Sequence, residues 1–150
     1  MAKSLKHATF VNYFKGRAKL ADVLDNAEQK MIAQGKGSVN AVGQCVYFND
    51  DGCSCAVGLL LPKDSKGVIL EKKVNVNGVT LLLHYVGGVL GLDPDRIETF
   101  QYEKLEAIKN LQTVHDNIAR QGYTGTEWVK RVKEGMAEYR EQHAAIIAKY

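Results

Sequence analysis

The sequence lacks the long, uninterrupted apolar run that a membrane-spanning helix requires. Its longest apolar stretches, Ala56–Leu61 and Val79–Leu92, are too short or are broken by glycine and histidine. The N-terminus also lacks the apolar core of a secretory signal. These absences predict a soluble, cytoplasmic protein that has no membrane partner.

Cysteine is scarce and its spacing is unlike that of a metal site. The three cysteines are Cys45, Cys53 and Cys55, an odd number that is typical of reduced intracellular thiols. Their spacing differs from the C-x₂-C pair of structural zinc sites, although His84, His115 or His143 could supply a fourth ligand. We expect small buried apolar thiols, with no bound metal and no other cofactor.

Neither charge nor glycine pattern indicates a nucleic-acid or phosphate site. The formal net charge of +3 is too small to predict a nucleic-acid partner, and no P-loop or Rossmann fingerprint is present. Basic residues strongly outnumber acidic ones only before Asp22. We expect this N-terminal segment to be solvated, and the alternative is that it forms a phosphate-binding arm. Lys15, Arg17 and Tyr47 are candidates for a nucleotide pocket of cations and aromatic rings. The alternative is that the scattered tyrosines pack in the core or at its rim.

The helical segments have the clearest patterns in the chain. With 150 residues, the sequence predicts one domain over 1–150. An apolar stripe begins near Leu20 and ends at a C-capping Gly35, and Asp93-Pro94 starts another helix. Two longer helices are predicted over about 103–121 and 125–149, the second opened by a capping box of Thr124 and Glu127.

A β-hairpin is predicted over about 45–56. Two β-rich segments, Cys45–Phe48 and Cys53–Ala56, flank a turn that ends in Asp51-Gly52. Val68–Leu70 and Lys72–Val76 could be further short strands, followed by a buried helix over Val79–Leu92. The predicted fold class is therefore α+β: a mainly helical domain in which a small antiparallel sheet packs against the long C-terminal helices.

Several short motifs resemble those of one protein family. They are Gln34-Gly35-Lys36-Gly37-Ser38, a CAxGxLxP segment at Cys55–Pro62, an LQxxHD segment at Leu111–Asp116, and a tryptophan about a dozen residues later, Trp128. Together they resemble a family of small uncharacterised proteins of tailed phages, over about half of the chain. Residues 63–104 fit the family's pattern poorly. The resemblance implies a phage origin and a shared fold, and it implies no reaction.

One constellation could carry chemistry. Cys55, His115 and Asp116 are the residue types of a thiol nucleophile, its base and an orienting carboxylate. However, neighbouring residues on a helix point about 100° apart, so Asp116 is not expected to orient His115. The alternative is that His115 packs inward, since it shares the apolar stripe of Leu111 and Ile118.

The sequence therefore favours binding over catalysis. The leading hypothesis is a non-catalytic phage accessory protein that acts in the host cytoplasm, antagonising a host anti-phage defence system. Its partner would be a host protein or a small nucleotide signal, and nucleic acid is not expected. The alternative is a cysteine-dependent enzyme that uses Cys55 and His115. The apolar stripe of the last helix is long enough that Tyr139–Tyr150 could pack on a second copy of the chain. The alternative is that residues 1–16 cover the same stripe within one chain.

Overall fold

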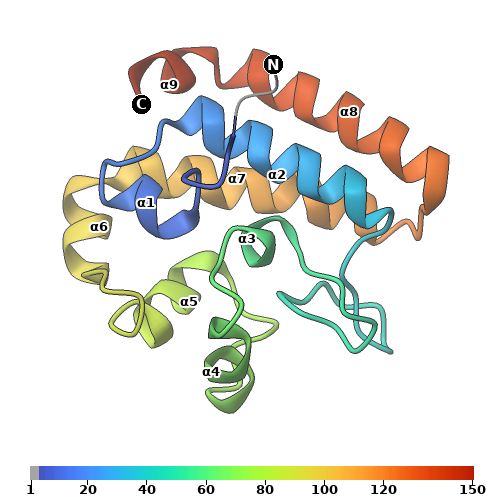
Figure 1. Ribbon diagram of the computed structural model, residues 1–150, viewed down its shortest axis with the longest axis horizontal. Coiled ribbons are helices and arrows are strands. Elements are labelled where there is room, and N and C mark those ends of the chain that lie inside the picture. Colours follow the sequence, from blue (N-terminus) through green and yellow to red (C-terminus); the bar gives the residue numbers. More distant parts are fainter. Residues whose placement is uncertain (1–3) are drawn as a thin grey trace.

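Three long helices form the body of the molecule (Figure 1). The computed structural model describes residues 4–150, so Lys3 of the basic N-terminal segment lies outside the described residues. Helix α8 packs on both α2 and α7, and the shorter α3 packs on α2 and α7. The helices, in chain order, are α1 (Phe10–Phe14), α2 (Leu20–Gln34), α3 (Ala56–Leu59), α4 (Ser65–Glu71), α5 (Val79–Val86), α6 (Pro94–Phe100), α7 (Tyr102–Ala119), α8 (Gly125–Gln142) and α9 (Ala144–Lys149).

The apolar periodicity explains why these helices pack as they do. The stripe of α2 faces inward, where Leu20, Leu24 and Met31 are all fully buried. Gly35 ends α2 in the left-handed conformation (φ 76°), and its amide donates to the Met31 carbonyl, which confirms the predicted cap. Asp93 likewise caps α6 by accepting from the Arg96 amide at 3.2 Å.

The predicted hairpin and α+β class are wrong. Helix holds 60% of the chain and bridge positions only 4%, so the domain is mostly helical. Over residues 4–150 the β-like pairing is limited to isolated bridges, among them Val39 with Cys45 and Phe48 with Ser54. Of the segments predicted as strands, 68–70 lies within α4 and 72–76 forms turns, and the helix predicted over Val79–Leu92 ends at Val86.

Side chains take the place of a strand ladder between α2 and α3. The Asn75 amide pairs with both backbone groups of Phe48, at 3.0 and 2.8 Å. The Asn49 side chain accepts from the Cys53 amide at 2.8 Å, and Gln34 accepts from Ser54 at 2.8 Å. These side-chain amides, together with scattered backbone bonds such as that from Cys55 N–H to the Tyr47 carbonyl at 3.1 Å, satisfy the backbone of the aromatic segment without a continuous partner strand.

The start and the end of the last helix differ from the prediction. Thr124 is the N-cap of α8 but makes no capping bond through its side chain, and Glu127 pairs with Arg131 at 2.8 Å. The prediction of a capping box at Thr124 and Glu127 is therefore wrong. The helix ends at Gln142, and α9 follows after His143 and contacts α2 and α7 of the same chain. The homodimer through this segment stays a prediction. Over residues 4–150, each helix is too short or too polar to cross a bilayer.

Candidate functional site

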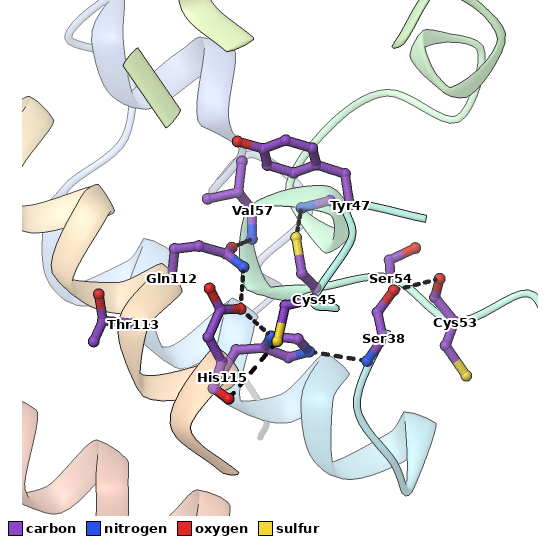
Figure 2. Close-up of polar contacts among 12 residues, drawn as sticks. Ser38, Cys45, Tyr47, Cys53, Ser54, Val57, Gln112, Thr113 and His115 are labelled. Carbon is purple, nitrogen blue, oxygen red and sulfur yellow. Dashed lines mark hydrogen bonds and ion pairs between the residues drawn. The ribbon is translucent and has the colours of Figure 1, made fainter. Parts of the chain in front are cut away.

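A cluster of polar side chains lies where α7 meets the 36–55 segment (Figure 2). Helix α7 contributes Gln112, His115 and Asp116, and the segment contributes Ser38 and Cys45. The spacing of the three α7 residues, i, i+3 and i+4, places them on one face of the helix. This face looks toward the segment whose conformation is held by side-chain amides.

His115 is fully buried, and its hydrogen-bond partners show which ring nitrogen carries the proton. The Ser38 amide can only donate, and it lies 3.1 Å from Nε2, so Nε2 is an acceptor. The neutral ring must then carry its proton on Nδ1, which donates to Asp116 Oδ1 at 2.8 Å. The inward packing of His115 agrees with its place on the apolar stripe. Both ring nitrogens are occupied, so no lone pair remains for a general base.

Asp116 does orient its neighbour, contrary to the sequence prediction. The two Cβ atoms diverge on the helix, but the carboxylate reaches back to the ring, at 2.8 Å. The same oxygen accepts from Gln112 Nε2 at 2.8 Å, while Gln112 Oε1 accepts from the Val57 amide at 3.0 Å. The second oxygen, Oδ2, accepts from no N–H group within residues 4–150, and the Cys45 thiol is the side-chain donor beside the carboxylate.

Cys45, rather than Cys55, is the thiol beside this pair. Its Sγ lies 3.7 Å from the Asp116 carbonyl oxygen, and the residue is half-buried. Burial raises the pKa of the Cys45 thiol to about 11, with a contribution from the Asp116 charge that the Arg120 charge only partly opposes. The thiol is therefore protonated at neutral pH and is a poor nucleophile.

Cys55 is placed as a structural residue. It is fully buried at the N-cap of α3, and its sulfur accepts from the Gly58 amide at 3.3 Å. Burial raises the pKa of this thiol to about 12. No hydrogen bond within residues 4–150 joins Cys55 to His115, so the predicted nucleophile and base are not paired. Cys53 is also buried.

The predicted nucleotide-binding residues do not converge. Tyr47 lines a cavity beside the Asp116 cluster, with its ring buried and its hydroxyl donating to the Asn77 carbonyl at 2.6 Å. Arg17 lines a different cavity, and Lys15 is exposed at the C-cap of α1. A single pocket built from these three residues is therefore absent from the described part of the chain.

The cavity beside the cluster has a volume of about 390 Å³. Cys45 and Asp116 form part of its wall, and Arg120, one turn after Asp116 on the same helix face, forms another part. Gln44, Asn75 and Asn77 also line it, so that the wall is rich in hydrogen-bonding groups. The volume falls within the range of small-molecule sites.

Comparison with protein-family models, with curated proteins and with solved structures gives no match to this chain. The resemblance to the phage family therefore stays a prediction. The chemistry of the site has to be argued from its own geometry.

Cys45, His115 and Asp116 are also the one group in residues 4–150 whose ligand atoms could surround a metal ion, all lying within 4.8 Å of one another. The hydrogen bonds oppose this use. A metal on Nδ1 of His115 would displace the proton that Asp116 accepts, and that proton would then have to sit on Nε2, where the Ser38 amide already points. With these hydrogen bonds in place, neither ring nitrogen of His115 has a lone pair to offer a metal ion.

Sequence reasoning missed three residues of this site: Ser38, Gln112 and Arg120. Gln112 and Arg120 share the helix face of Asp116 at intervals of four, which is a signal the sequence contains. Ser38 acts through its backbone amide, so no side-chain pattern could have indicated it.

We expect His115→Ala to lower the free energy of unfolding by about 1–3 kcal/mol. The change removes a fully buried ring and leaves the Ser38 amide without its acceptor. Chemical denaturation followed by circular dichroism measures the loss. His84→Ala is the control, because His84 makes an exposed pair with Glu98 and should cost less than about 1 kcal/mol. An unchanged melting temperature for His115→Ala, combined with lost biological activity, would indicate a role in a functional site instead.

We expect slow and strongly pH-dependent alkylation of Cys45. Its pKa of about 11 stands above the ordinary 9.0, so at about pH 8 the thiolate fraction, and with it the rate, falls roughly a hundredfold below that of free cysteine. The rate should keep rising up to about pH 11, whereas an ordinary thiol levels off near 9.0. Iodoacetamide labelling with peptide mass spectrometry measures the rate at each site, and the urea-unfolded chain is the control. Rapid labelling of Cys55 alone at neutral pH would contradict the structural assignment.

Proposed function

We propose that this chain is a non-catalytic binding protein whose ligand occupies the cavity beside Asp116 and Arg120. The ligand class is a small molecule that carries both N–H donors and a negative charge, as a nucleotide does. We further propose that it is a phage accessory protein that acts in the host cytoplasm by sequestering a nucleotide signal of a defence system. The phage setting is supported by the sequence resemblance alone, the binding role by the protonated thiols and occupied histidine of the site, and the ligand class by the cavity.

The observation that carries the ligand class is the separation of charges in the cavity wall. Asp116 has one oxygen saturated by His115 and Gln112 and one that accepts from no N–H group within residues 4–150, with the Cys45 thiol beside the carboxylate. Arg120 is exposed, and no ion pair within that range joins it to Asp116. A carboxylate oxygen accepts the N–H groups of a base edge, and a guanidinium binds a phosphate in a two-pronged manner. The rigid network behind Asp116 holds the carboxylate in place before the ligand arrives.

The cysteine-dependent enzyme has less support. Nucleophilic catalysis needs a thiolate and a base with an available lone pair. Here burial keeps both Cys45 and Cys55 protonated, and the Ser38 amide occupies Nε2 of His115. Protein binding remains the second candidate for the mode of action. It is favoured by an apolar stripe on α5, where Leu81 and Tyr85 are 45% and 53% exposed.

The test is titration calorimetry with AMP, GMP, CMP and UMP, followed by the tightest binder on two variants. Arg120→Ala should weaken binding by about tenfold, the usual effect of one charge-assisted hydrogen bond. Lys130→Ala, which removes an exposed charge from α8, is the matched control and should leave the affinity unchanged. The proposal fails if none of the four nucleotides binds, or if Arg120→Ala binds as tightly as the unaltered chain.

A further inference from the structure

A second cavity, of about 480 Å³, lies at the start of α2, and four of its nine lining residues are lysine or arginine. Arg17 and Lys19 come from the segment before α2, Lys104 from the first turn of α7, and Lys149 from the end of α9. Against these four cationic side chains stands one acidic side chain, Asp22. Figure 1 shows the starts of α2 and α7 meeting α9 at one end of the bundle, so the fold collects charges that are far apart in sequence.

Lys104 is the least solvated of these cations, only 9% exposed. Its ammonium donates to the Tyr13 carbonyl and lies 4.4 Å from the centroid of the Tyr13 ring. No acidic side chain within residues 4–150 forms an ion pair with it, and burial lowers its pKa. A buried charge without a counter-ion is costly, and an anion in the adjoining cavity would offset that cost.

The other cations differ in how much of their charge is already compensated. Lys149 pairs with Glu103 at 2.7 Å, and Asp22 lies 3.4 Å from His7. Arg17 and Lys19 are exposed, and neither side chain has a hydrogen-bond or ion-pair partner within residues 4–150. Lys19 is also the N-cap of the 15-residue α2, where no side chain caps the helix and the helix dipole adds to the positive potential. One amide of this first turn, that of Leu20, already donates to the main-chain oxygen of Tyr150 at 3.1 Å.

We propose that this cavity binds the phosphoryl groups of a small phosphorylated molecule, with Arg17, Lys19 and Lys104 as its counter-charges. Two or three linked phosphates match cations that face a common space better than a single monoanion does. A nucleic-acid duplex would instead require cations spread along a surface stripe at the spacing of the phosphates. This site shares no residue with the Asp116 cavity, so it stands or falls independently of the function proposed for that cavity.

Titration calorimetry with inorganic pyrophosphate at low salt tests this site. We expect binding to the unaltered chain that weakens as sodium chloride is added. The double variant Arg17→Ala/Lys19→Ala should bind pyrophosphate at least about tenfold more weakly. Lys66→Ala/Lys72→Ala removes the same charge from exposed positions elsewhere and should leave the affinity within about twofold. Circular dichroism of each variant checks that it is folded.

Four results would overturn the proposal. The first is that pyrophosphate does not bind the unaltered chain. The second is that both double variants lose affinity equally, which would indicate a diffuse effect of net charge. The third is that a mixed-sequence DNA duplex binds more tightly than pyrophosphate and loses affinity in the Arg17→Ala/Lys19→Ala variant, which would assign the surface to nucleic acid. Loss of pyrophosphate binding in Arg120→Ala alone would place the anion in the other cavity and would also overturn this assignment.

Discussion

Replacing Trp128 with alanine is expected to lower the free energy of unfolding by about 3–5 kcal/mol. The indole is fully buried between α2 and α7, and its Nε1 donates to the Met31 carbonyl at 2.7 Å. It also meets the His115 ring edge to face, with centroids 6.0 Å apart. Truncation therefore opens a cavity, leaves a buried carbonyl without its donor, and removes one wall from the His115 cluster.

Trp128→Phe is the matched control for this prediction. It keeps most of the aromatic volume but loses the bond to Met31, and should cost about 1–3 kcal/mol. Because the chain has a single tryptophan, its fluorescence disappears in both variants, and urea unfolding has to be followed by circular dichroism. A loss below about 1 kcal/mol for Trp128→Ala would contradict the full burial of the indole.

Replacing Gly58 with alanine is expected to lower the free energy of unfolding by about 3 kcal/mol, a large effect for the addition of one methyl group. A Cβ at this position would collide with the Tyr47 carbonyl oxygen and lie 3.2 Å from the Ser54 Cβ. The Tyr47 oxygen belongs to the backbone, which cannot move away by changing a rotamer. Relief requires α3 to shift, and this also disturbs the bond from the Gly58 amide to Cys55.

Gly67 is the control for Gly58. It lies within α4, and nothing stands within 4 Å of the position that its Cβ would take. Gly67→Ala should therefore raise stability by about 0.4–1 kcal/mol through helix propensity and a more restricted unfolded chain. In thermal unfolding, the melting temperature should fall for Gly58→Ala and rise for Gly67→Ala. Equal effects in the two variants would show that close packing at Gly58 is not what limits substitution there.

The helices could be predicted from the sequence where local rules determine them. Gly35 and Asp93 act at helix ends through their own backbone or side chain, so a short window contains the necessary information. The hairpin prediction is wrong because the pairing of its two segments shrinks to the one bridge of Phe48 with Ser54, while the backbone N–H and C=O of Phe48 bond to the side chain of Asn75, 27 residues away. β-propensity indicates an extended backbone but does not reveal what satisfies its hydrogen bonds.

The candidate site also combines features that a local sequence pattern predicts with features that it does not. The burial of His115 follows from its place on a helical stripe, a local property. Which sulfur lies beside His115 does not follow from a local pattern. Cys45 and Cys55 both lie between α2 and α3, and only the path of that loop decides which of them reaches Asp116. The sequence prediction for Asp116 rests on the angle between neighbouring Cβ atoms, and its side chain is long enough to close that angle.

The segment between α2 and α3 has a consequence for how the sequence can vary. In a strand ladder the backbone supplies the bonds, so many side chains can be exchanged without loss. Here the side chains of Gln34, Asn49 and Asn75 supply part of them, each at one place and with one geometry. A saturating substitution library should therefore find this irregular segment less permissive at its amide residues than the exposed faces of the helices around it.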